Sequence, residues 1–289
     1  MNDVVDDAAP ARPPRSDDII ALAEGKRKSA LASGALQPIR TTTEWLAQDG
    51  LEFPVRWVDS LARKARTASS PAVDPFADPE PDLLVADAGD DHRILLNKYP
   101  VIDRHLLIVS RAFVDQSAPL EAADFNAILP LLRDVGGLVF YNGDRIAGAS
   151  QRHRHLQWIP RGKDVALPLL RALESAAGAG HDRCNDWPYR HWIAALPAST
   201  WASADGPHAL DTCYRAGCRA LALAGANASA YNLLLTRSAL LLVPRSRESV
   251  EDVSINALGF AGSFFVGARA RIEAIRRATP FGVLAAVGR

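Results

Sequence analysis

The sequence predicts a mixed α+β fold with a largely antiparallel sheet flanked by helices. Two observations predict this class. Short apolar runs with strand character are joined by turns, and segments with helical spacing lie between them. The 289 residues are 48% apolar and 23% charged, which is the balance of a globular protein that can bury a large core.

The N-terminal part begins with residues that lack regular structure. Residues 1–16 are rich in Ala, Pro, Asp and Arg, and we predict that they form a disordered tail. Ser16 is a suitable N-cap, so a helix is predicted from there to about Ala32, where Gly34 can end it. Four prolines in residues 66–82 predict a long surface loop.

The middle of the chain carries the strand signals. Strands are predicted at residues 93–97, 105–110, 138–141 and 156–159. Residues 121–135 have apolar side chains at helical spacing, although Pro130 is an objection to one continuous helix. We predict that Gly136 and Gly137 end this helix and that Asn142 and Gly143 form a turn.

The last third predicts helices at residues 167–177, 209–224 and 264–278, with Pro280 stopping the last of them. Residues 230–235 and 239–243 predict a β-hairpin across residues 236–238.

Charge and composition exclude several function classes. Lys and Arg total 33, as do Asp and Glu, so the formal net charge is zero, which argues against a nucleic-acid partner. No run of about 20 apolar residues predicts a membrane span. The acidic N-terminus lacks the pattern of a secretory signal, and three cysteines do not make a disulfide framework. We therefore expect a cytoplasmic protein, and the zero net charge is compatible with a monomer.

The chemistry concentrates in residues 148–160. If this stretch forms a strand, alternate side chains share a face, so His153, His155 and Gln157 line one face and Arg154 and Leu156 the other. Just upstream lies a turn of small and polar residues whose backbone N–H groups can approach an anion: Gly148, Ala149, Ser150 and Gln151.

Such a row of side chains suits phosphoryl chemistry. A neutral imidazole is a good nucleophile toward phosphorus near pH 7, and attack on an α-phosphate gives a covalent nucleotidyl-histidine. Two alternatives stay open on spacing alone: a metal site, for which we find no third ligand, and a solvated strand edge. We predict no protein-bound metal.

Residues 148–157 resemble the signature of the histidine-triad (HIT) superfamily, in the branch where glutamine replaces the third histidine. That branch includes the diadenosine tetraphosphate (Ap4A) phosphorylases, or ATP adenylyltransferases, and the galactose-1-phosphate uridylyltransferases. Other segments are more similar to the phosphorylases, and the resemblance covers roughly residues 28–289. These segments are residues 82–87, 97–101, 105–109, 231–246 and 255–263.

The resemblance implies a HIT-like fold and reversible conversion of Ap4A and phosphate into ATP and ADP. In this family pattern His155 is the nucleophile, His153 positions it, and Gln157 binds the phosphate. Further positions that match nucleotide or phosphate contacts are Asn97, Gly148, Ala149, Ser150, Gln151 and Lys64. The implied organisation is a tail at 1–16, a part with the catalytic motif at 17–165, and an ATP adenylyltransferase part at 166–289 that completes the same fold.

An amide at position 157 can donate a hydrogen bond but cannot supply a proton, so we expect transfer to phosphate to be favoured over hydrolysis. Mg²⁺ is expected to arrive with the nucleotide, without a tightly bound metal or organic cofactor. Uridylyl transfer and a non-catalytic nucleotide sensor remain as alternatives.

Outside this core site we expect structural roles for His105 and His191 and core packing for Trp187, Trp192 and Trp201. Asn232 and Ser246 could reach the site.

Overall fold

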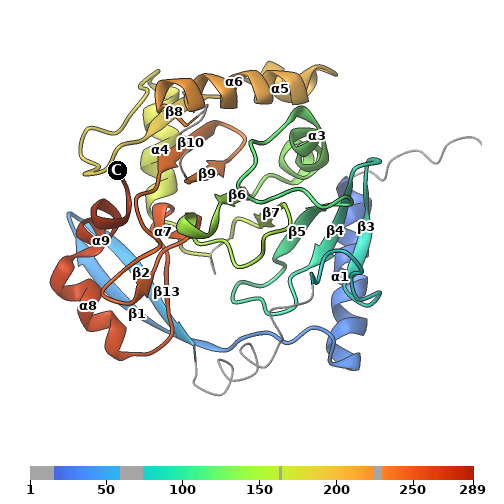
Figure 1. Cartoon of the computed structure of the whole chain (residues 1–289), viewed down its shortest axis with the longest axis horizontal. Coiled ribbons are helices and arrows are strands. Elements are labelled where there is room, and N and C mark those ends of the chain that lie inside the picture. The colour runs from blue at the N-terminus through green and yellow to red at the C-terminus, as the bar shows by residue number, and fades with distance from the viewer. Residues whose placement is uncertain (1–15, 59–73, 163–164, 224–229) are drawn as a thin grey trace, which may run out of the picture.

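The centre of the computed structural model is an eight-stranded sheet in which every neighbouring pair is antiparallel (Figure 1). The structure describes residues 16–58, 74–162, 165–223 and 230–289. Strands from both sides of residue 165 enter the one sheet. In spatial order they are β3 (Leu84–Ala88), β4 (His92–Leu96), β5 (Leu106–Ser110), β7 (His155–Ile159), β6 (Leu138–Gly143), β9 (Tyr231–Leu235), β10 (Ala239–Pro244) and β8 (Trp192–Ala195).

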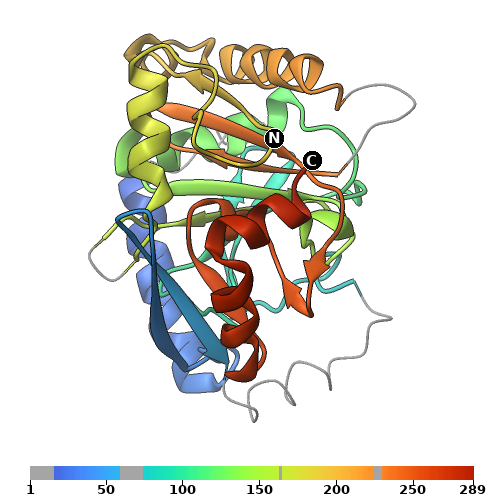
Figure 2. The same cartoon turned by 90° about the vertical axis from the view of Figure 1, so that its left-hand side faces the viewer.

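Two apolar clusters cover the opposite faces of this sheet. One face packs against α1 (Ser16–Ser33), α3 (Ala122–Pro130), α5 (Ala198–Ala202) and α6 (Gly206–Ala220). The other packs against α4 (Leu169–Gly178), α7 (Ala257–Phe260), α8 (Ala270–Ala278), α9 (Pro280–Val287) and a small sheet of β1 (Thr41–Gln48), β2 (Leu51–Val58) and β13 (Phe264–Val266). Figure 2 shows α6 above the long strands and α8, α9 and the β1–β2 hairpin below them.

The alternation of apolar side chains explains why both faces are covered. On β6, Val139 and Tyr141 belong to the cluster under α3 and α6, whereas Leu138 and Phe140 belong to the cluster under α4 and α9. All four side chains are buried. Because both of its faces are buried, this part of β6 is apolar throughout. The predicted largely antiparallel α+β fold is confirmed.

One predicted turn is wrong. Asn142 and Gly143 continue β6, where they pair with Asn232 and Tyr231 of β9. Asparagine-glycine is a frequent turn sequence, but the glycine has a different cause here. A Cβ at Gly143 would lie 2.8 Å from the ring of Tyr231, so glycine leaves room for two packed aromatic rings.

The C-terminal segment also differs from its prediction. Residues 264–266 form β13, parallel to β2, and only residues 270–278 are helical. Pro280 does follow the end of α8, but it also begins α9, because proline is well accommodated in the first turn of a helix. Several further elements went unpredicted: the β1–β2 hairpin, β3, β8, α5, α7, and the pair β11 (Ser249–Val250) and β12 (Val253–Ser254).

The remaining predictions agree with the structure within a few residues. The first helix begins at Ser16, and Gly34 follows it with a φ of 79°. The predicted helix at 121–135 is α3 followed by a π-helical turn at Leu131–Val135, with Pro130 as the last residue of α3. Residues 1–15 and 59–73 lie outside the described residues, and 74–82 contain no helix or strand. Within the described part of the chain, no helix is long and apolar enough to cross a membrane.

We predict that Gly143→Ala destabilises the protein by about 1–3 kcal/mol, because its Cβ would overpack the two tyrosine rings. Gly25→Ala is the matched control. It lies within α1 with open space around the Cβ position, and removing a helical glycine should stabilise by roughly 0.5–1 kcal/mol. Urea unfolding followed by tryptophan fluorescence measures both changes. Equal stability of Gly143→Ala and the unmodified protein would show that the rings have room.

Candidate active site

Strand β7 places the two catalytic candidates with side chains on one face of the sheet. His155 is opposite Val109 of β5, and Gln157 is opposite Leu107 of β5 and Phe140 of β6. The intervening Leu156 lies in the cluster on the other face, as the alternation predicts. His153 lies outside β7 but forms an isolated bridge with Asp115, and its ring shares Phe76 as a neighbour with the His155 ring. The predicted row of side chains is therefore present.

The tautomer of His155 follows from its surroundings. Its Nδ1 lies 2.8 Å from the carbonyl oxygen of His153. A carbonyl only accepts, so Nδ1 carries the proton and Nε2 keeps a lone pair. Burial lowers the pKa of His155 from 6.5 to about 4, so the ring is neutral near pH 7. A neutral imidazole with a free Nε2 is a nucleophile.

The amide of Gln157 is held by a relay of two side chains. The backbone N–H of Tyr99 donates to Asn97 Oδ1, so the Asn97 amide nitrogen faces His105 Nδ1 at 3.0 Å and donates to it. The proton of His105 is then on Nε2, which donates to Gln157 Oε1 at 2.9 Å. Burial lowers the pKa of His105 to about 4, so this ring is also neutral. The relay leaves the –NH₂ group of Gln157 as a donor for the site.

The predicted anion-binding turn follows β6 and leads into the histidine motif. Gly148 has a φ of 91°, and a Cβ there would lie 2.9 Å from Asn256 and from the carbonyl of Ile255, so only glycine fits. Ser150 is exposed. The backbone N–H groups of Gly148 and Ala149 donate to the carbonyls of Arg145 and Asp144, so they are not available to an anion. Among the described residues, the backbone N–H groups and the side chains of Ser150 and Gln151 have no hydrogen-bond partner. These groups lie in the segment that leads to His155 at the start of β7.

The buried side chain of Arg245 holds the backbone next to this turn through hydrogen bonds. Its Nη1 donates to the carbonyls of Ala147 and Ile255 and to Asn232 Oδ1. Asn232 Nδ2 donates to the same Ala147 carbonyl at 2.8 Å. Asn232 therefore reaches the back of the turn, whereas Ser246 hydrogen-bonds the carbonyl of Val287.

Gln116 is a positioning residue that the sequence pattern did not reveal. Its Oε1 accepts from the backbone N–H of His155, and its Nε2 donates to the carbonyls of His155 and Asn142. Its own carbonyl accepts from the hydroxyl of buried Tyr141. This fully bonded amide fixes the backbone of His155 relative to β6. Only the fold brings position 116 beside position 155, so no local signal could have found it.

Arg154 anchors the opposite face of the motif. Its guanidinium donates to buried Asp124 at 3.0 Å and to the carbonyl of Pro119. His92 and the backbone N–H of Glu121 also donate to the Asp124 carboxylate. The prediction that Arg154 points away from the site is confirmed, and its ion pair holds the chain between the two histidines.

The other candidates lie in several places. Lys64 falls outside the described residues. His191 hydrogen-bonds the backbone of Cys184 and Tyr189, in agreement with its predicted structural role. The tryptophans predicted to pack in the core do so: Trp187, Trp192 and Trp201.

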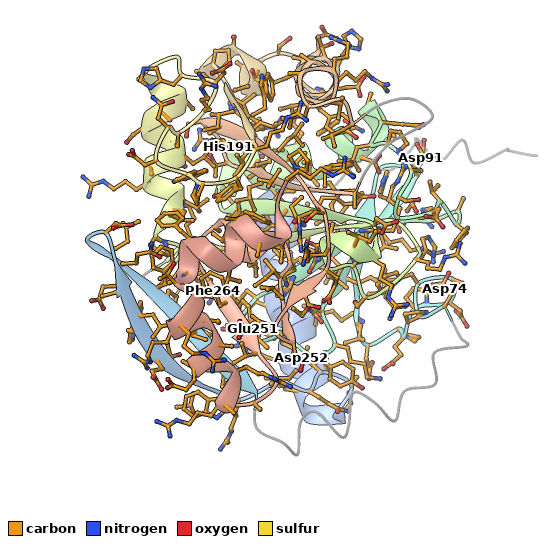
Figure 3. All side chains as sticks on the ribbon, turned by 60° about the vertical axis from the view of Figure 1, so that its left-hand side comes forward. Asp74, Asp91, His191, Glu251, Asp252 and Phe264 are labelled. Carbon is orange, nitrogen blue, oxygen red and sulfur yellow. The ribbon has the colours of Figure 1, made fainter. Side chains whose placement is uncertain are left out.

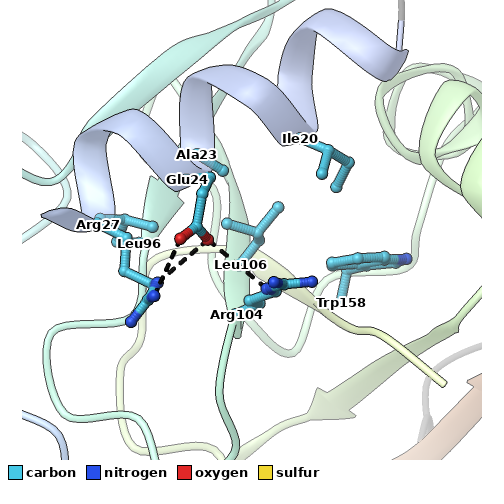
Figure 4. A pocket seen from close by; sticks show the side chains of 8 residues that line it. All are labelled: Ile20, Ala23, Glu24, Arg27, Leu96, Arg104, Leu106 and Trp158. Carbon is cyan, nitrogen blue, oxygen red and sulfur yellow. Dashed lines mark hydrogen bonds and ion pairs between the residues drawn. The ribbon is translucent and has the colours of Figure 1, made fainter. Parts of the chain in front are cut away.

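The described residues hold no metal cluster, and the pocket under α1 lies apart from the histidine site. Across the described ranges, no group of three or more His, Cys, Asp or Glu side chains could hold a metal ion. Figure 4 shows a small pocket under α1, where Glu24 pairs with Arg27 and Arg104. Its wall includes Leu106 and Trp158, which point to the face opposite His155. It is not part of the histidine site.

Comparison with known protein families shows the family to which this chain belongs. Residues 11–175 match the Ap4A phosphorylase N-terminal domain, and residues 185–289 match the ATP adenylyltransferase C-terminal domain. The chain belongs to the Ap4A phosphorylase family. His105, His153 and His155 lie within the first of these two matches.

Two relatives in this family come from Saccharomyces cerevisiae. Diadenosine 5',5'''-P1,P4-tetraphosphate phosphorylase 2 is 30% identical over 267 residues, covering 78% of this chain and 79% of the relative. Protein APA1 is 28% identical and covers 85% of each. The crystal structure of a yeast Ap4A phosphorylase in complex with AMP matches with a TM-score of 0.79 at 25% identity, over 94% of this chain and 96% of that chain. The same yeast protein in complex with Ap4A matches with a TM-score of 0.76.

We predict that a long-range ¹H–¹⁵N spectrum of this phosphorylase-family protein at pH 7.5 shows His155 protonated only at Nδ1. The signal should begin to titrate only as the pH approaches 4, because burial disfavours the charged ring. A His155→Gln variant assigns the signal by its disappearance. A His155 ring protonated at Nε2 would contradict the tautomer.

We also predict that acid destabilises the fold between pH 6.5 and pH 4. His155 and His105 have a pKa of about 4 when folded, against 6.5 as their ordinary value, so the unfolded chain binds more protons in this window. Stability is full above pH 6.5 and falls as the pH decreases, by up to roughly 3 kcal/mol for each ring. Urea unfolding at pH 7.5, 6 and 5 measures the slope. His105→Gln should reduce it, and an unchanged slope in that variant would contradict the assignment.

Proposed function

We propose that this protein is an Ap4A phosphorylase that works through a covalent adenylyl-histidine. Ap4A and phosphate are converted reversibly into ATP and ADP. The observation that carries the proposal is the buried, neutral His155, whose Nδ1–H is tied to the carbonyl of His153 and whose Nε2 is thereby left as a nucleophile. Family membership supplies the nucleotide substrate.

The first step forms one bond and breaks one. His155 Nε2 attacks an α-phosphorus of Ap4A, and the oxygen between the α- and β-phosphates leaves with its electron pair, which releases ATP. The product is an adenylyl-imidazolium whose Nδ1–H still donates to the carbonyl of His153. In the second step an oxygen of inorganic phosphate attacks the same phosphorus, the N–P bond breaks, and ADP leaves with His155 neutral again.

The hydrogen-bond donors around His155 can stabilise the negative charge on the phosphoryl oxygens. The amide –NH₂ of Gln157 and the donors of Ser150 and Gln151 are available at the end of β7, and a fixed array of donors stabilises developing charge without reorganisation. Asn97 is proposed to contact the ribose in addition to holding His105. Lys64 remains a proposed phosphate contact from the sequence.

Several further properties are proposals from composition and chemistry. Mg²⁺ accompanies the polyphosphate as part of the substrate and neutralises its charge. The protein acts as a monomer in the cytoplasm, with no nucleic-acid partner. Analytical ultracentrifugation at micromolar concentration tests the monomer.

The decisive experiment incubates the protein with Ap4A and Mg²⁺, with and without phosphate, and separates the products. We predict equal amounts of ATP and ADP, formed only with phosphate. His155→Ala should abolish this turnover, because no other group can form the intermediate. His208→Ala, on the exposed start of α6, should retain it. AMP and ATP formed without phosphate would make the protein a hydrolase, and turnover of UDP-glucose would favour the uridylyltransferase alternative.

The relay to Gln157 makes a separate prediction. His105→Leu removes the donor to Gln157 Oε1, so the amide loses its fixed orientation and kcat should fall roughly tenfold to hundredfold with a smaller change in KM. His105→Gln can still donate to Gln157 and should recover part of the rate. His181→Gln, at an exposed position with no side-chain hydrogen bond to described residues, is the control. If His105→Leu has the same kcat as the unmodified protein, the relay has no catalytic role.

A further inference from the structure

The ring of His153 is surrounded by hydrogen-bond acceptors. Its Nδ1 lies 2.7 Å from Asp74 Oδ2, and its Nε2 lies 2.7 Å from the carbonyl of Ser110 and 3.1 Å from that of Ala112. The His153 side chain is 2% exposed, so water cannot substitute for these partners. A neutral imidazole carries one N–H and would direct a lone pair at one of these oxygens. Only a doubly protonated ring donates to all of them.

We infer that Asp74 is a positioning residue for the proposed reaction, and that it holds His153 as an imidazolium cation beside the nucleophile. The carboxylate balances the charge of a ring that has left water. It is itself fixed, because Asp74 Oδ1 accepts from the backbone N–H of Phe76 at 3.0 Å. The inference rests on the proposed function only for its catalytic consequence, because the protonation state belongs to the free protein.

The turn at residues 74–76 places Phe76 next to both His153 and the nucleophile candidate His155. The ring of Phe76 contacts both imidazoles, with centroid distances of 5.9 Å to His153 and 5.2 Å to His155. Figure 3 shows Asp74 near the surface, on the side of the view opposite the β1–β2 hairpin. The sequence placed these residues only in a proline-rich loop.

The other charged groups near His153 have partners of their own. The carboxylate of Asp115, its bridge partner, accepts from Ser117 and from Arg152. Arg154 is paired with Asp124 on the opposite face. Asp74 is therefore the carboxylate that faces the ring within the described part of the chain.

The cation has two effects on His155. The carbonyl that accepts from His155 Nδ1–H belongs to His153, so fixing His153 fixes the tautomer and direction of the nucleophile. A positive charge next to His155 also disfavours its protonation, which keeps Nε2 available. A neutral His153 would lose a hydrogen bond to Asp74 or to Ser110 and would be free to shift.

The test compares Asp74→Asn with Asp78→Asn, which changes a carboxylate four residues away that has no hydrogen bond or ion pair with described residues. Long-range ¹H–¹⁵N spectra of the nucleotide-free proteins at pH 7.5 report the ring directly. We expect both His153 nitrogens to be protonated in the unmodified protein and in Asp78→Asn, and one of them to lose its proton in Asp74→Asn. A neutral His153 in the unmodified protein would overturn the inference.

Kinetics of Ap4A phosphorolysis provide the second readout. Asp74→Asn should lower kcat about tenfold to hundredfold with little change in KM, Asp74→Glu should restore part of the loss, and Asp78→Asn should match the unmodified protein. If Asp74→Asn has the same kcat as the unmodified protein, the positioning role is refuted. If the spectra show the cation but the unmodified protein does not phosphorolyse Ap4A, the proposed function fails while the ion pair stands.

Discussion

The buried ion pair between Arg154 and Asp124 is the constraint on which the histidine site depends. Arg154 separates His153 from His155, so holding its side chain on one face of the sheet directs both neighbours toward the other face. Asp124 also accepts from His92 and from the backbone at the start of α3, so the pair ties α3 to β4 and to the motif. Breaking a buried pair of this kind typically costs about 3–5 kcal/mol. A slip of the motif by one residue would incur that cost and would also bury a charge without a partner.

The predicted anion-binding turn, in the middle of the chain, is held by contacts from the C-terminal part. Arg245 lies after β10, yet its guanidinium donates to Ala147, before Gly148, and to Val287, in α9. Burial lowers the pKa of Arg245 to about 10, so it stays charged at neutral pH even though its hydrogen bonds go to carbonyl and amide oxygens. A fixed positive charge directly behind the turn favours an anion in front of it. The C-terminal residues thus hold the turn that leads into the proposed catalytic residues, which all lie before residue 160.

Local sequence patterns were sufficient for some features and not for others. The period of two along residues 153–157 predicted the shared face of the histidines and Gln157, because a paired strand permits no other arrangement. The Asn142–Gly143 turn failed because pairing with β9 outweighs the local preference for a turn, and β13 was merged with α8 because three apolar residues fit either period. Gln116, Asp74 and the role of His105 could not be found from local patterns. Each acts through a contact with a residue between 39 and 79 positions away, and only the folded chain brings such pairs together.

The protonation states explain how such a site can transfer an adenylyl group without an acid catalyst. The leaving group in the first step is ATP, a stable anion near neutral pH, so its oxygen does not require a proton from the protein. Gln157 has none to give, and the relay from Asn97 through His105 keeps its –NH₂ group, not its carbonyl, directed into the site. Water, unlike phosphate, must lose a proton to become an effective nucleophile. In the proposed intermediate His155 could not accept that proton, because its Nε2 would carry the adenylyl group. Phosphate already carries the negative charge it needs. In the proposed mechanism, the neutral imidazole of His155 and the fixed amide of Gln157 would therefore favour phosphorolysis over hydrolysis.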